Sequence, residues 1–274
     1  MSMRILPADV ELLEAETWAT LHGSFANKAG GQAATVKRWG RAAALVTRDV
    51  AVAAVNRAIG FGFDRALDQQ QLAEIWQFYR DSGKARWFLE RSPSATMDDT
   101  MLAEAGGIIG GTVLKLVAEL ADLPELPVAA FEVVEATAQD ATTFMGLVGP
   151  LLGVPEPGRP GIVATMGEPG WRFYFALIES RPIAGAAMFL GGDGAWLGLA
   201  GTLPAYRHRG AQTALLSRRI LDARATACRW ISAETSPEAL GDNPSLRNMK
   251  RLGLRELYHR PWYRFTDPRE LREP

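Results

Sequence analysis

One short turn of the sequence contains two arginines and a glycine, a combination that can bind an anionic group. The turn reads PAYRHRGAQ and holds Arg207, Arg209 and Gly210, between an apolar strand-like run and a helical pattern within residues 195–226. A helix start leaves backbone N–H groups unpaired and carries partial positive charge. A phosphate group can accept hydrogen bonds from them, a glycine lets it approach closely, and arginines add charge-assisted bonds. The turn therefore predicts a phosphate-binding site.

This segment resembles the acetyl-CoA-binding motif of the GCN5-related N-acetyltransferase (GNAT) superfamily, Arg/Gln-x-x-Gly-x-Gly/Ala between a central strand and a long helix. Arg207 and Gly210 match the motif, and Gln212 stands where Gly or Ala is usual but still exposes its backbone N–H. The resemblance implies acetyl-CoA as acyl donor, with backbone N–H groups near the strand end polarising the thioester carbonyl. The implied cofactor-binding residues are Leu199, Ala200, Gly201, Thr202, Arg207, His208, Arg209, Gly210, Ala211, Gln212 and Thr213.

A second stretch, SLRNMKRLGL at residues 245–254, resembles the later helix and strand start of the same family. By that resemblance Asn248 faces the pantetheine or phosphate arm, although a helix surface position explains this residue equally well. The resemblance covers roughly residues 129–265.

The family's reaction is direct attack of an amine on the thioester in a ternary complex, which needs a base and is helped by an acid. Residues 195–202 contain no Asp or Glu, so Glu234, at the end of the next strand, is the candidate base. The later helix holds no tyrosine, which leaves Tyr258 as the candidate acid. A solvated strand end and a strand core residue are the structural alternatives for these two. The missing strand acid also keeps a second function open, a non-catalytic acyl-CoA-binding sensor or scaffold.

Composition excludes several other classes. The formal net charge of −1 argues against a nucleic-acid partner, and no apolar stretch is long enough for a membrane span. The three histidines and one cysteine have no metal-ligand spacing, so no metal is expected. The start lacks the pattern of a secretory signal, and we expect a cytoplasmic protein. The expected partner is a small-molecule or peptide amine, and a homodimer is kept as one oligomeric state.

Periodicity and turn residues predict an alternation of strands and helices, with Asp68 as a helix N-cap, Gly83 as a helix end and a hairpin turn at 191–194. Expected loops are residues 22–40, including Gly30 and Gly31, and residues 153–170, which are a candidate cover for a binding site. Expected helices are 10–21, 69–82, 94–105, 140–152, 210–226 and 244–252. Expected strands are 43–47, 51–63, 87–89, 113–120, 131–135, 172–179, 183–190, 195–202, 230–234 and 255–265.

The proline-rich run DLPELP at residues 122–127 is the predicted linker. Residues 1–127 are predicted to form a degenerate GNAT-like N-terminal domain without the cofactor motif, and residues 128–274 an acetyl-CoA-binding GNAT domain. The predicted fold class is α/β (α+β), with a mixed, mostly antiparallel GNAT sheet flanked by helices. The whole chain then resembles a tandem GNAT arrangement.

Overall fold

The computed structural model describes residues 5–28, 33–52, 55–237 and 243–269, and the chain forms two compact units. Unit 1 consists of Met1–Ile5 and Leu114–Tyr258, and unit 2 of Leu6–Val113 and His259–Pro274. The chain passes from unit 2 to unit 1 within strand β5 (Ile108–Glu119) and back within strand β11 (Arg255–Thr266). The predicted functional domains 1–127 and 128–274 stay a prediction.

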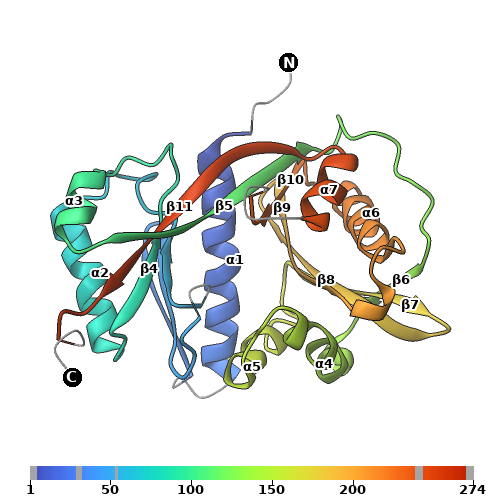
Figure 1. Ribbon diagram of the computed structural model, residues 1–274, viewed down its shortest axis with the longest axis horizontal. Helices are drawn as coiled ribbons and strands as arrows, with labels where there is room; N and C mark the ends of the chain where they lie inside the picture. The colour runs from blue at the N-terminus through green and yellow to red at the C-terminus, as the bar shows by residue number, and fades with distance from the viewer. Residues whose placement is uncertain (1–4, 29–32, 53–54, 238–242, 270–274) are drawn as a thin grey trace. The chain divides into compact units, whose positions relative to one another are not determined.

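Unit 1 contains a sheet in the order β5-β10-β9-β8-β7-β6. Its pairs are antiparallel except β9 with β10, which are parallel. Figure 1 shows α4 and α5 on one side of this sheet and α6 and α7 on the other. The strands are β6 (Glu132–Ala136), β7 (Trp171–Ile178), β8 (Arg181–Gly191), β9 (Gly194–Thr202) and β10 (Trp230–Thr235). The helices are α4 (Ala141–Leu151), α5 (Arg159–Val163), α6 (Ala211–Arg224) and α7 (Pro244–Arg251), with short 3-10 turns η2 (Ala138–Asp140), η3 (Glu156–Gly158) and η4 (Pro204–Tyr206).

The core of unit 1 lies where apolar residues of the strands meet α6 and α7. Leu215 and Ile220 of α6 pack with Ala184 and Ile231 of the sheet and Leu246 of α7, and all five are fully buried. Burial of this apolar surface is the main force that fixes α6 on the sheet. The sheet and α6 therefore form a rigid base for the turn between β9 and α6.

Unit 2 contains a sheet in the order β1-β2-β3-β4-β11, in which only β3 and β4 are parallel. The stacked rings of Tyr79, Trp87 and Phe265 lie in the core of unit 2. The ring centroids are 4.7 Å apart for Tyr79 and Trp87 and 4.3 Å apart for Trp87 and Phe265. The strands other than β5 and β11 are β1 (Ala34–Trp39), β2 (Ala42–Thr47), β3 (Arg57–Ile59) and β4 (Arg86–Glu90). The helices are α1 (Pro7–Lys28), α2 (Gln69–Asp81) and α3 (Asp99–Glu104).

The predicted fold class is confirmed, and so are several local predictions. The Asp68 carboxylate accepts a hydrogen bond of 2.7 Å from the Gln71 N–H and caps α2. Gly83 follows α2 at a φ of +68°, and Gly192 turns the β8–β9 hairpin at a φ of +59°. Such left-handed conformations favour glycine, which explains why these glycines marked the turns.

Other element predictions are wrong. Residues 22–28, expected in a loop, continue α1, because His22 and Phe25 lie on its buried side. Part of the same expected loop forms β1, and Gly30 and Gly31 lie outside the described residues. The expected strand 51–63 is reduced to β3, with residues 53–54 outside the described residues.

Two further segments differ from expectation. The expected helix 94–105 is only α3, which begins after the N-cap Asp98. Gly110 and Gly111 lie within β5, which begins before the expected strand 113–120. The Trp262 ring fills the space that a side chain at either glycine would need. The expected loop 153–170 includes η3 and α5.

Candidate functional site

The parallel strands β9 and β10 pair only along their first residues. Their register runs from Gly194 opposite Trp230 to Leu197 opposite Ala233. β9 then continues from Gly198 to Thr202 without a β10 partner among the described residues. The backbone groups on this edge of β9 are therefore available to other partners beyond Leu197.

A β-bulge lies at the start of the part of β9 that pairs with β8 alone. Gly201 pairs with Gly185 and Gly198 with Ala187, so three steps on β9 match two steps on β8. Leu199 has a φ of +48°, a left-handed conformation that costs a non-glycine residue roughly 1–2 kcal/mol. Such strained residues persist where the surrounding structure holds them, often at functional sites. The predicted donors Leu199 to Thr202 thus lie on and directly after this bulge.

The turn after β9 leads through η4 to the start of α6. Gly210 is the N-cap of α6, with a φ of +93° and no side-chain cap hydrogen bond. Its carbonyl accepts a hydrogen bond of 2.9 Å from the Ala214 N–H, which is the first hydrogen bond within the helix. The N–H groups between Gly210 and Ala214 therefore have no acceptor within the helix. Those groups belong to the predicted residues Ala211, Gln212 and Thr213.

Side chains of the turn fold back onto the end of β9. The Arg207 Nε donates to the Thr202 carbonyl at 3.3 Å, and the Gln212 Nε2 donates to the Thr202 hydroxyl at 3.2 Å. Arg209 lies 5.7 Å above the Tyr206 ring and is exposed, as are Arg207 and His208. The Gln212 side chain is thus held on β9, which keeps the helix start lined by backbone groups.

Unit 2 offers a direct comparison, since α2 also follows a parallel strand. There the Asp68 carboxylate already accepts a hydrogen bond from the helix start, and its charge complements the helix dipole. At α6 the corresponding position is a glycine without a side chain. Of these two helix starts, α6 is the one suited to an anion from outside the chain.

Glu234 is the first residue of β10 beyond its pairing with β9. It lies opposite Lys115 of β5, and the Lys115 Nζ is 3.1 Å from its Oε2. The Lys115 side chain is 1% exposed and the Glu234 side chain 24%. The structure therefore brings the candidate base to the place where the strands stop pairing, held by a buried cation.

The other two candidates lie on separate elements. Asn248 is half-buried on α7, which packs against α6, and Tyr258 is half-buried on β11. Neither belongs to the continuous run from Leu199 to Thr213. The roles proposed for Asn248, Tyr258 and Glu234 stay predictions.

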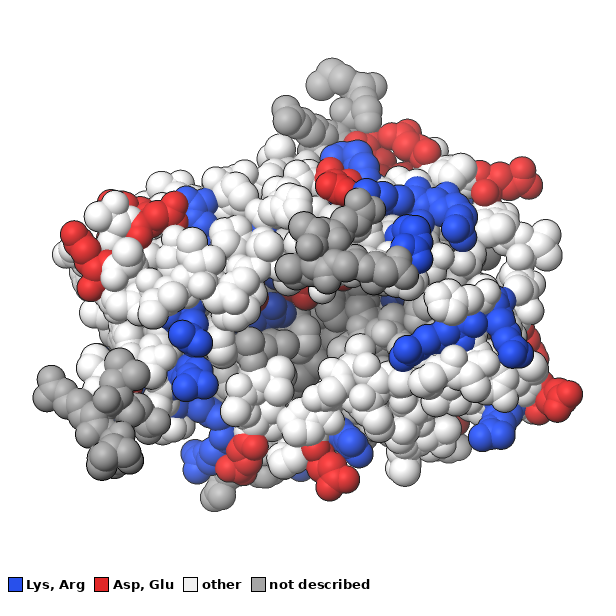
Figure 2. Space-filling model, viewed as in Figure 1, with Lys and Arg blue, Asp and Glu red and all other residues white. Residues whose placement is uncertain are grey.

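The visible face of the molecule carries Lys and Arg side chains over α6 and α7 (Figure 2). Exposed basic residues of these helices and the preceding turn include Arg207, Arg209, Lys250 and Arg251. A cationic surface raises the local concentration of anionic ligands. Of these residues, Arg207 and Arg209 belong to the turn before α6, and their charges favour a phosphate-bearing ligand there.

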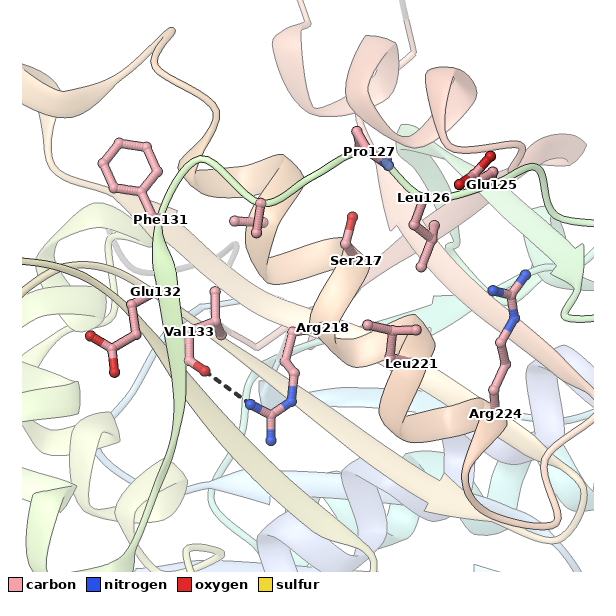
Figure 3. Close-up of a pocket in the computed structure, with 12 residues that line it drawn as sticks. Glu125, Leu126, Pro127, Phe131, Glu132, Val133, Ser217, Arg218, Leu221 and Arg224 are labelled. Atoms are coloured by element: carbon pink, nitrogen blue, oxygen red, sulfur yellow. Dashed lines mark hydrogen bonds between the residues drawn. The ribbon is translucent and has the colours of Figure 1, made fainter.

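A groove of about 600 Å³ lies between α6 and the segment before β6 (Figure 3). In it the Arg218 Nη1 donates to the Val133 carbonyl at 2.9 Å. None of the predicted site residues lines this groove, which is bounded by Glu125, Leu126, Pro127, Ala129, Phe131, Glu132, Val133, Ala214, Ser217, Arg218, Leu221 and Arg224. The groove is therefore distinct from the turn at the start of α6.

Sequence reasoning missed two buried cations near the site, Lys115 and Arg219. Arg219 falls on a stripe of α6 with Ala211, Leu215 and Ala223, each four residues apart and each buried. A charged residue within an apolar helical stripe is the signal that was available for Arg219. Lys115 likewise lies within an apolar run, residues 113–117, but its partner Glu234 is distant in sequence.

Comparison with known proteins shows the fold. No protein-family model matches the chain, and no curated protein matches it. Among solved structures, a GCN5-related N-acetyltransferase from Kribbella flavida is similar with a TM-score of 0.62 and 18% identity, covering 97% of both chains. A tandem GNAT protein from the clavulanic acid biosynthesis pathway has a TM-score of 0.58 and 14% identity, covering 95% of this chain and 93% of that one.

A GCN5-related N-acetyltransferase from Sphaerobacter thermophilus is also similar, with a TM-score of 0.56 and 14% identity, covering 96% of this chain and 94% of that one. The chain therefore has the GNAT fold, and the likeness extends over nearly its whole length. At these identities the likeness establishes the fold, and the function has to be argued from the site itself.

None of the helices among the described residues has the length and apolar character of a membrane span. The same residues contain no group of three or more His, Cys, Asp or Glu side chains that could hold a metal ion.

Proposed function

We propose that this protein is an N-acetyltransferase that moves the acetyl group from acetyl-CoA to an amine by direct attack in a ternary complex. The observation that carries the proposal is the start of α6 without a side-chain cap, which follows, after one turn, the bulged end of β9 that has no β10 partner. A helix start binds phosphate and an unpaired strand edge binds an extended chain through its backbone groups. Acetyl-CoA combines both chemistries in one molecule.

The residues present fit this ligand. A Cβ added to Gly210 would lie 3.3 Å from the Ala130 Cβ, so glycine keeps this close space open at a φ of +93°. The N–H groups of Ala211, Gln212 and Thr213 would hold the pyrophosphate, with Arg207 and Arg209 adding charge. When bound, acetyl-CoA supplies an activated acetyl thioester.

The remaining roles fall to residues around the unpaired end of β9. N–H groups of Leu199 to Thr202 would donate to the developing oxyanion, which is the preorganised arrangement that acyl transfer requires. Glu234 would accept the amine proton, directly or through water, and Tyr258 would return a proton to the thiolate. The acceptor would be an amine of a small molecule or a peptide.

One observation favours a second function, a non-catalytic acyl-CoA-binding sensor or scaffold. Glu234, the candidate base, is already in an ion pair with Lys115. β9 itself carries no acidic residue. A protein with this site could bind acyl-CoA without an effective base.

Calorimetric titration with acetyl-CoA tests the part that both functions share. We expect saturable binding at one site per chain, and no heat together with no thermal shift would refute both. If acetyl-CoA binds, release of free CoA thiol in the presence of a panel of amines separates the two functions. Thiol release that depends on an amine supports the transferase, whereas binding without release across the panel supports the sensor.

A further inference from the structure

Arg219 is a buried cation of α6 whose acceptors, within the described part of the chain, are backbone carbonyls. Its side chain is 2% exposed. Its Nε donates to Leu215 of its own helix at 3.1 Å, and its Nη1 reaches the Ala187 carbonyl at 3.0 Å and the Gly198 carbonyl at 3.5 Å. Burial lowers the pKa of the guanidinium to about 10, so the group remains a cation at neutral pH. Burying a charge costs free energy, and hydrogen bonds to these carbonyls offset part of that cost.

The two sheet carbonyls identify what Arg219 holds. Ala187 and Gly198 are the last paired residues before the bulge in β9. Gly198 has no room for a side chain, because the Trp196 ring lies 2.0 Å from the position of an added Cβ. Arg219 therefore contacts the sheet at the point where the strained residue Leu199 follows.

The Gly198 carbonyl and the Leu199 N–H belong to the same peptide unit. A planar trans peptide points its C=O and its N–H in opposite directions. A carbonyl that accepts a hydrogen bond from a cation also makes the N–H of its own peptide a stronger donor. The contact of Arg219 with the Gly198 carbonyl therefore favours one direction of the Leu199 N–H and strengthens it as a donor.

We propose that Arg219 is a positioning residue that holds the peptide between Gly198 and Leu199 in the bulge and thereby aims the Leu199 N–H at the acyl carbonyl. Arg219 holds the peptide already in the free protein, whereas the aim of the Leu199 N–H at an acyl carbonyl rests on the proposed function. Arg219 touches neither substrate nor reacting atoms and acts through the β9 backbone.

The experiment compares Arg219→Met with Arg224→Met in the full-length chain. Arg224 lies on the same helix and also donates to backbone carbonyls, those of Leu120 and Leu123, away from the bulge. In the free protein, we expect R219M to shift the carbonyl ¹³C signals of Ala187 and Gly198 and the amide signal of Leu199. R224M should leave these three signals in place.

Calorimetry with acetyl-CoA and with CoA then tests the role of Leu199. R219M should lose about tenfold in affinity for acetyl-CoA, the factor for one hydrogen bond to a polar group, and keep the wild-type affinity for CoA, which lacks the acyl carbonyl. A purely structural role would lower both affinities together. R224M should change neither.

Arg219→Lys decides the matter if R219M does not fold. One ammonium replaces a planar fork, so R219K should shift the same three signals to a smaller degree. Wild-type signals of Gly198 and Leu199 in folded R219M, or in R219K, would overturn the inference. Absence of acetyl-CoA binding by the wild type would instead overturn the proposed function and leave the bulge assignment to the NMR result.

Discussion

Gly210 is the residue on which the proposed phosphate site depends most directly. Its φ of +93° is a conformation that side chains rarely adopt, and an added Cβ would lie 3.3 Å from Ala130. Gly210→Asp adds a negative charge where the phosphate would lie and should abolish acetyl-CoA binding in calorimetry. Gly210→Asn has nearly the same shape and tolerates positive φ, so it should retain more affinity than the aspartate variant.

A second glycine, Gly192, serves as a control for the effect of placing an aspartate at a residue with a positive φ. Gly192 also has a positive φ, +59°, and an added Cβ there has no heavy atom within 4 Å. Gly192→Asp places the same charge at another residue with a positive φ, in the β8–β9 hairpin. It should bind acetyl-CoA like the wild type, and Gly210→Asp with wild-type affinity would remove the pyrophosphate from the start of α6.

Asp64 provides a test of the electrostatics of unit 2. Hydrogen bonds from the Arg41 side chain and from the Arg41 N–H hold the pKa of its carboxyl below the ordinary value of 3.8. A lowered folded-state pKa adds stability at pH values above 3.8, which is lost as the pH falls through the folded-state value. The pair is partly exposed, so its coupling free energy at pH 7 should be only about 0.2–1 kcal/mol.

The measurement is a carboxyl NMR titration combined with a double-mutant cycle of Arg41→Gln and Asp64→Asn in urea. Arg41→Gln should raise the pKa of Asp64 toward 3.8. Arg38→Gln, which removes an ion pair with Glu16 instead, should leave it unchanged. A titration of Asp64 that does not respond to Arg41→Gln would contradict this assignment.

At the residue scale, the sequence predicts features that depend on local backbone chemistry. Asp68 as a cap and Gly83 as a helix end follow from rules that involve only a few neighbouring residues. Leu199 with its positive φ could not be predicted, because the bulge arises from pairing with β8. Its strain is a property of the sheet and leaves no sign in the local sequence.

At the element scale, strands and helices with clear periodicity were predicted within a few residues. α6, β7, β8 and β9 belong to this group, and each has a regular pattern bounded by turn residues. The end of α1 was missed because its last turns carry small and polar residues, although His22 and Phe25 are buried. β1 was missed for a related reason, since half of its residues are exposed and only Ala34 is buried.

β5 leads to a prediction about the boundary of the folded unit. Its residues Leu114 to Glu119 pair with β10, and Leu114 and Leu116 are at most 1% exposed. A fragment of residues 114–258 should therefore unfold cooperatively on heating. A fragment of residues 128–258 leaves the β10 edge unpaired and loses these leucines, each of which contributes about 2–5 kcal/mol.

Thermal unfolding followed by circular dichroism compares the two fragments. The shorter fragment should have a lower Tm and a broader transition, or should aggregate. Leu116→Ala in the longer fragment is the intermediate case, because it keeps the strand and removes one buried side chain. Equal Tm values for the two fragments would show that β5 is dispensable for unit 1.

At the scale of the whole molecule, the path of β11 is the feature that the sequence did not predict. The strand itself was predicted at residues 255–265, but its contribution to unit 2 was not. Trp262 to Thr266 pair with β4, and Arg260 makes buried ion pairs with Glu11 and Glu14 of α1. Periodicity indicates that a strand exists and gives no information about which distant strand it joins.

The path of β11 has a consequence for how the protein is made. During synthesis the ribosome releases residues 6–113 before residues 114–258, yet the strand that covers β4 and supplies Phe265 to the Tyr79–Trp87 stack follows residue 258. Unit 2 is therefore completed only after unit 1 has been translated, and until then the β4 edge lacks its partner.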